Sequence, residues 1–170
     1  MEFLETIENS YIKWESYSKE DVICDRFPLD IWCQIAGDIH SDKEWDSFVS
    51  SYPNSVKCWV LKRNDINLPI AFIYIYNEDY TWGKVSIHGG GWTSPLLHYR
   101  GYILMLKYLL EKGIKVRTYC HLTNTTAIRF DRSVGFVPYR YTEDEVFMWI
   151  NEKRLKGTKL YKRFYLNDNL

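Results

Sequence analysis

The sequence predicts a single α+β domain built on a mixed, mostly antiparallel sheet flanked by helices. Three observations support this fold class. The alternation of apolar and polar residues that is typical of strands dominates residues 56–88. A helical stretch at residues 99–112 then separates two extended stretches, and this order requires a parallel crossover connection. Finally, neither an internal repeat nor a Gly/Ser-rich linker divides the chain, so residues 1–170 are expected to form one domain.

Two helices are expected in the amino-terminal third of the chain. The first begins near Pro28 and continues to about His40, because apolar residues recur there at helical spacing. The second has Ser41 as its N-cap and Glu44 three residues later, which is the pattern of a capping box, and it stops before Pro53.

Three strands of an antiparallel meander are expected next. They are predicted, with polar turns between them, at residues 56–62, 70–76 and 84–88. The middle strand is rich in β-branched and aromatic residues, as is typical of a central strand. The glycines at 89–91 are expected to end the third strand.

The carboxyl-terminal half has the clearest helix of the sequence, from about Tyr99 to Lys112, which Gly113 is expected to terminate. The elements predicted after it are a strand at 115–121, a short helix at 125–133 that ends at Gly135, and a hairpin of strands at 137–141 and 146–150. Six basic residues between Lys153 and Arg163 are typical of a solvated, partly flexible end.

Charge and cysteine content limit the classes of function. The 22 basic residues balance the 22 acidic ones, so no net field attracts nucleic acid or an anionic membrane. The four cysteines lie far apart without metal-ligand spacing, which predicts free thiols in a reducing cytoplasm and no metal site. The amino terminus lacks a signal-peptide pattern, and no stretch approaches the ~20 apolar residues that span a bilayer. A cytoplasmic protein is therefore expected.

The segment Asn124-Thr-Thr-Ala-Ile-Arg-Phe-Asp-Arg-Ser-Val-Gly-Phe136 has the sharpest motif. Its Asn can cap the following helix, Ala127 lets that helix lie close to a flat group, and Gly135 permits a left-handed helix stop. With the order of elements, this segment resembles the Asn-x-x-Ala…Gly-Phe segment of the GNAT acyltransferases. The resemblance covers residues 56–150.

This resemblance implies a transferase that moves an acyl group, with acetyl expected, from acyl-coenzyme A to an amine of a small molecule or peptide. It implies that Asn124, Ala127 and Phe130 form a wall of the coenzyme site. Neither a metal nor a nucleic-acid or membrane partner is implied, and a homodimer is left open. The alternative is a GNAT-shaped binding module that has lost catalysis.

A second family landmark is a turn that binds pyrophosphate, with the pattern Gln or Arg, x, x, Gly, x, Gly or Ala. The matching residues here are His98, Tyr99, Arg100, Gly101, Tyr102 and Ile103. His98 and Ile103 depart from the pattern, and a β-branched side chain at the second of these can obstruct the approach of phosphate. Arg100 can still offer a charged contact, and a helix N-terminus favours phosphate. Coenzyme binding is therefore predicted for the five residues from Tyr99 to Ile103.

Acyl transfer to an amine needs a base for the amine and an acid for the leaving thiolate. His88 is predicted as the base, because the resemblance puts it at a splayed strand pair and histidine titrates near neutral pH. His121, Glu78 and Asp79 are the other candidates. Many family members have an acidic Tyr seven residues after the Asn of the motif. Asp131 holds this place here, and an ionised Asp is a poor acid.

Overall fold

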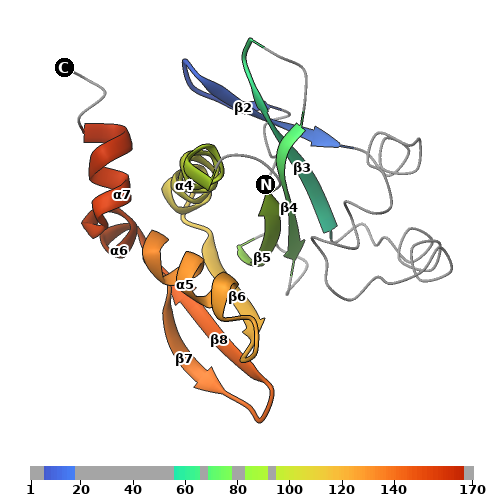
Figure 1. The fold of residues 1–170 in the computed structure, drawn as a ribbon, viewed down its shortest axis with the longest axis vertical. Coiled ribbons are helices and arrows are strands. Elements are labelled where there is room, and N and C mark those ends of the chain that lie inside the picture. The colour runs from blue at the N-terminus through green and yellow to red at the C-terminus, as the bar shows by residue number, and fades with distance from the viewer. Residues whose placement is uncertain (1–5, 18–55, 66–68, 78–82, 92–94, 167–170) are drawn as a thin grey trace, which may run out of the picture. The chain divides into compact units, whose positions relative to one another are not determined.

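The computed structural model describes residues 6–17, 56–65, 69–77, 83–91 and 95–166 (Figure 1). They fall into two compact units, the first made mainly of residues 2–76 and the second of residues 77–88 and 99–170. Both helices predicted before Pro53 lie outside the described residues.

The first unit is an antiparallel arrangement of four strands in the order β1-β2-β3-β4. The strands are β1 (Thr6–Glu8), β2 (Ile12–Tyr17), β3 (Val56–Arg63) and β4 (Pro69–Asn77). The antiparallel pairing of β3 with β4 was predicted from their alternating residues. The first two strands were not predicted.

A polar turn and a short alternation of buried and half-buried side chains explain why β1 and β2 form a hairpin. Asn9 accepts hydrogen bonds through its side-chain oxygen from the backbone amides of Tyr11 and Ile12, at 2.9 and 3.1 Å. After this turn Ile12 and Trp14 are fully buried, whereas Lys13 between them is half-buried. The pattern was visible in the sequence, but it covers too few residues to be distinctive.

The second unit is a mixed sheet with the strand order β5-β6-β8-β7. Its strands are β5 (Lys84–Gly91), β6 (Lys115–His121), β7 (Val137–Tyr141) and β8 (Glu145–Ile150). β5 and β6 are parallel, and the other two pairs are antiparallel. The parallel crossover is thus confirmed. The prediction that the glycines at 89–91 end β5 was wrong, because a residue without a side chain does not exclude extended backbone.

The two longest helices are α4 (Pro95–Glu111) and α5 (Thr125–Val134). α4 begins at Pro95 rather than at the predicted Tyr99, since proline suits the first turn of a helix, where its missing N–H has no helical partner to lose. It ends as predicted before Gly113, which has a left-handed φ of 75°. The buried side of α4 includes Ile103, Leu106 and Leu109, all at 0% exposure.

The termini of α5 form as the sequence motif predicts. The side-chain oxygen of Asn124 accepts a hydrogen bond of 3.1 Å from the backbone amide of Ala127. At the other end Gly135 adopts a left-handed φ of 111°, and the amide of Phe136 donates to the carbonyl of Asp131. Phe136 then enters the core with 1% exposure.

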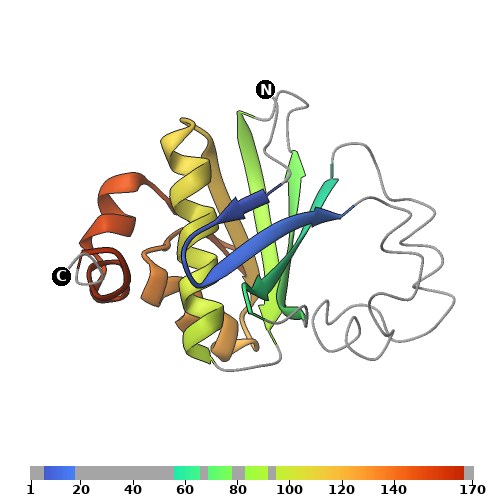
Figure 2. The ribbon, with the colours of Figure 1, turned by 90° about the horizontal axis from the view of Figure 1, so that it is seen from above.

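The carboxyl-terminal stretch is helical, which was not predicted, while its basic residues are exposed as expected. It consists of α6 (Glu152–Gly157), α7 (Lys159–Tyr161) and the π-helical turn η1 (Lys162–Leu166). Leu155, Tyr161 and Phe164 are buried, which anchors a segment whose basic residues are exposed. These helices lie beside α4 (Figure 2), where the Tyr165 hydroxyl donates to the carbonyl of Arg100 at 3.4 Å. Among the described helices, none has the length and apolar character needed to cross a membrane.

Candidate active site

The parallel strands β5 and β6 pair over part of their length. In the part of the chain that the structure describes, their register runs from Lys84↔Lys115 to Ser86↔Arg117, whereas β6 continues to His121. Backbone groups beyond the paired residues need other partners. This partly paired stretch of β5 and β6 is named the strand opening.

His88 of β5 lies on one side of the strand opening. Its ring meets the ring of Tyr119 of β6 edge-on, with 4.4 Å between the centroids and 70° between the planes. His121, an alternative base, is exposed at the end of β6. Glu78 and Asp79 lie outside the described residues. The predicted base therefore contacts the strand that borders the opening.

Asp131 of α5 lies on the buried side of β6. It is 5% exposed, and its Oδ2 accepts a hydrogen bond of 3.2 Å from the Cys120 thiol. Burial raises the pKa of this carboxyl to about 7, and the hydrogen bond from Cys120 acts in the opposite direction. Burial thus favours the protonated carboxyl, whereas the role of Asp131 in catalysis stays a prediction. A carboxyl with this pKa keeps its proton in much of the population at neutral pH and can serve as an acid.

Three of the predicted coenzyme-binding residues form one aromatic cluster. Tyr99 of α4 stacks on Phe130 of α5, with 4.5 Å between ring centroids and 19° between the planes. Tyr102 meets the same ring edge-on at 5.0 Å. Burial raises the pKa of the Tyr102 hydroxyl well above its usual value, and the charge of Asp131 raises it further. The cluster thus connects the predicted coenzyme wall to the buried carboxyl.

The predicted pyrophosphate turn lies inside α4 rather than ahead of it. Because the helix begins at Pro95, the amides of residues 99–103 come after the first turn, where helical amides bond to carbonyls four residues earlier. Gly101 is buried, and the Ile103 side chain is fully buried in the core. The obstruction of phosphate expected from Ile103 therefore loses its basis, and the phosphate role of these amides stays a prediction.

The remaining predicted coenzyme-site residues and the neighbouring His98 differ in what they can offer a phosphate. Burial lowers the pKa of His98 to about 4, so this side chain is neutral at pH 7 and offers no positive charge to a phosphate. Arg100 has its guanidinium 5.2 Å from the ring centroid of Phe164. Asn124 and Ala127 make the helix cap described above, which leaves their contact with a coenzyme a prediction.

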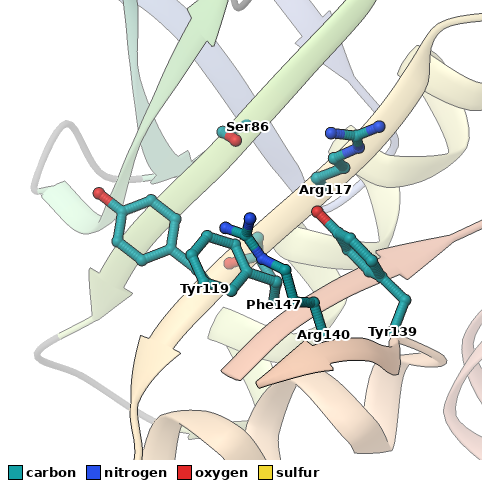
Figure 3. Close-up of a pocket in the computed structure, with 7 residues that line it drawn as sticks. Ser86, Arg117, Tyr119, Tyr139, Arg140 and Phe147 are labelled. Carbon is teal, nitrogen blue, oxygen red and sulfur yellow. The ribbon is translucent and has the colours of Figure 1, made fainter. Parts of the chain in front are cut away.

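A pocket of about 370 Å³ lies in the second unit, over the sheet β5-β6-β8-β7 (Figure 3). It is lined by Ser86, Arg117, Thr118, Tyr119, Tyr139, Arg140 and Phe147. No sequence motif predicted this pocket. These residues come from four strands and share no motif, so only the known pairing of those strands brings them together.

Comparison with solved structures decides the fold. A GNAT-family acetyltransferase from Bacillus anthracis matches with a TM-score of 0.66 at 13% identity, over 87% of this chain and 99% of that one. The chain has the GNAT fold. A probable GNAT-family acetyltransferase from Chromobacterium violaceum matches with a TM-score of 0.66 at 15% identity, over 90% and 89% of the two chains. The spermidine N-acetyltransferase from Vibrio cholerae, solved with CoA and spermine, matches with a TM-score of 0.62 at 13% identity. The match covers 88% of this chain and 100% of that one. No protein-family model and no curated protein matches the sequence.

Proposed function

We propose that this GNAT-fold chain is an acyl-coenzyme A-dependent N-acyltransferase that transfers acetyl to an amine of a small molecule or peptide. The observation that carries the proposal is the strand opening between β5 and β6. His88 of β5 contacts Tyr119 of β6 there, and the buried carboxyl of Asp131 is hydrogen-bonded to the next residue of β6, Cys120. A structural neighbour, the spermidine N-acetyltransferase, was solved with CoA and the amine spermine. That neighbour supports the two kinds of substrate proposed here.

Side chains of α4 and α5 fit an acyl-coenzyme A in two respects. The stacked rings of Tyr99 and Phe130 offer flat apolar surface, and the guanidinium of Arg100 offers a positive charge to phosphate. β6 continues to His121, beyond Arg117, the last residue that pairs with β5, and an extended amide-containing chain can lie along this stretch in the manner of a neighbouring strand. When bound, the coenzyme would supply the activated acyl group.

His88 and Asp131 would move the two protons of the reaction. His88 would take a proton from the amine nitrogen of the acceptor, which makes that nitrogen nucleophilic. Asp131 would give its proton to the sulfur that leaves, and its raised pKa suits this step at neutral pH. The Cys120 thiol would hold the carboxyl in place through its hydrogen bond.

Release of free thiol from acetyl-CoA, measured with a panel of amines, tests this function. The proposal expects release that depends on the amine for at least one acceptor. Binding of the coenzyme without release for any amine would favour the alternative, a GNAT-fold binding module without catalysis. The neutral His98 is the observation that favours this alternative, because it departs from the usual phosphate-binding residue.

A further inference from the structure

The pocket over the second sheet combines positively charged and aromatic side chains. Two of its lining residues are arginines, three are aromatic and none is acidic. Its volume of about 370 Å³ is in the range of small-molecule sites, which is ~300–1,000 Å³. The chemistry of the lining therefore indicates what kind of small molecule it would take.

A β-bulge places two successive side chains in the pocket. The register of β7 with β8 shifts between Pro138↔Met148 and Arg140↔Phe147, so Tyr139 is an extra residue on β7. In a regular strand Tyr139 and Arg140 would point to opposite faces, but a bulge can aim both to one side. Both extend from β7 into the pocket (Figure 3).

Both guanidinium groups of the pocket lie over aromatic rings. Arg140 lies 3.9 Å from the ring centroid of Phe147, and Arg117 lies 5.5 Å from that of Tyr139. For Arg140, stacking covers a flat face of the guanidinium and leaves the N–H donors at its edge for an oxyanion. Within the described ranges Arg140 forms no ion pair with a carboxylate. An anion can therefore bind it without displacing a protein carboxylate.

The pocket shares a wall with the predicted base. Tyr119 lines the pocket and stacks on Phe147, with 5.6 Å between ring centroids, while the same tyrosine contacts the ring of His88. A molecule in the pocket therefore lies next to a residue that touches the base.

We propose that this pocket binds the acyl acceptor, and that the acceptor carries an oxyanion and a flat ring in addition to its amine. The inference rests on the proposed function and names the class of its acceptor. Arg117 and Arg140 hold the oxyanion, and the rings of Tyr139 and Phe147 contact the flat group. The amine is then directed toward His88.

Matched ligand pairs test the preference for an oxyanion. The full chain is titrated calorimetrically with phenylalanine and phenylalaninamide, which differ in the carboxylate, and with phenyl phosphate and phenol, which differ in the phosphate. The anionic member of at least one pair should bind at least ~10-fold more tightly, as expected for charged hydrogen bonds. The pair with the larger difference identifies the oxyanion as carboxylate or phosphate. Equal affinities within both pairs would overturn the proposal.

Substitutions in the pocket assign the effect to its arginines. Arg140→Gln should lower the affinity for the anionic probe at least ~10-fold. Arg140→Lys, which keeps the charge but loses the planar guanidinium, should lower that affinity less. The control Arg129→Gln changes an exposed arginine of α5 outside the pocket and should have no effect. Arg117→Gln tests the second guanidinium independently, and thermal unfolding verifies that each variant is folded.

Acetyl-CoA affinity of the same variants separates this inference from the proposed function. Arg140→Gln should bind acetyl-CoA as tightly as the unmodified chain. Weaker acetyl-CoA binding in this variant would overturn the inference, because the pocket would then belong to the coenzyme. Unchanged probe binding in both arginine variants would overturn it too. Failure of the unmodified chain to bind acetyl-CoA would contradict the proposed function, while the ligand pairs would still decide the nature of the pocket.

Discussion

The Cys120 thiol donates a hydrogen bond to Oδ2 of Asp131, with 3.2 Å between the sulfur and the oxygen. This contact joins β6 to α5 at a carboxyl that is 5% exposed. Burial disfavours the charged carboxylate and raises the pKa of Asp131 to about 7, while the thiol hydrogen bond partly offsets this rise. The residue pair therefore sets the pH at which the proposed acid works.

Asp131→Asn removes the proposed acid without much change in size. Turnover should fall by about 10²–10⁴-fold, while acetyl-CoA affinity stays close to that of the unmodified chain. Since the acid works in its protonated form, turnover of the unmodified chain should decrease as pH rises through about 7. Steady-state rates across this pH range check both points. An identical decrease in the Asn variant would show that another group causes it.

The same carboxyl should make stability depend on pH. Its pKa is about 7 in the folded chain against a reference value of 3.8, so between these values the unfolded chain binds fewer protons than the folded one. The free energy of unfolding should therefore decrease from about pH 4 to about pH 7, by on the order of 4 kcal/mol from this group. Asp131→Asn should remove this contribution. Denaturant unfolding at both ends of the range checks the prediction, and an equal effect of the substitution at both ends contradicts it.

Cys120→Ala should move the alkaline decrease in turnover to higher pH. The thiol hydrogen bond stabilises the carboxylate form, so its loss raises the pKa of Asp131 further. A shift of about one pH unit corresponds to a lost hydrogen bond of ordinary strength. Cys120→Ser keeps a donor at this position and serves as the matched control. A shift to lower pH in the Ala variant would contradict the proposed role of the thiol.

His88→Gln should separate chemistry from coenzyme binding. Turnover is expected to fall about 10²–10⁴-fold, with acetyl-CoA affinity nearly intact, because a general base acts on the acceptor amine. His121→Gln is the matched control at the exposed end of β6. Kinetics and calorimetry of both variants measure the two effects. Full activity in the His88 variant would assign it a structural role and make His121 the next candidate.

Gly135→Ala should destabilise the chain by about 2 kcal/mol or more. Gly135 has a φ of 111°, which L-residues rarely adopt, and an added Cβ would lie 3.1 Å from the carbonyl oxygen of Arg154. The control Gly157→Ala adds a Cβ with no atom within 4 Å, in a helix that favours alanine. It should leave stability unchanged or raise it by up to ~1 kcal/mol. Equal effects of the two substitutions in denaturant unfolding would contradict this account.

Local chemistry explains what could be predicted from the sequence. The cap made by Asn124 and the left-handed stop at Gly135 depend on nearby residues, so α5 formed with almost the predicted bounds. The apolar, β-branched and aromatic residues of β3 and β4 likewise mark buried strands, and Trp59, Val60 and Leu61 are all buried. The start of α4 at Pro95 was missed, because a proline after a glycine-rich stretch also suits a loop.

Tertiary packing explains the rest. The acidity of Asp131 depends on its burial against β6, which no spacing in the sequence reveals. The carboxyl-terminal helices were not predicted, because the few apolar residues that anchor them, such as Leu155 and Phe164, stand among many charged ones. The pocket depends on a bulge at Tyr139 and on pairing between distant strands. Such features follow from the assembled sheet and not from any one segment.

Calorimetric titration with acetyl-CoA tests most directly the claim on which every other prediction depends, that the chain binds an acyl-coenzyme A. The account predicts saturable binding at a single site, and it predicts that Arg100→Ala weakens this binding by about 1–3 kcal/mol, the range for a lost charged hydrogen bond. Unchanged affinity in that variant would remove Arg100 from the site. Absence of any binding heat for the unmodified chain at about 1 mM acetyl-CoA, where even weak substrates occupy their sites, would contradict the claim itself.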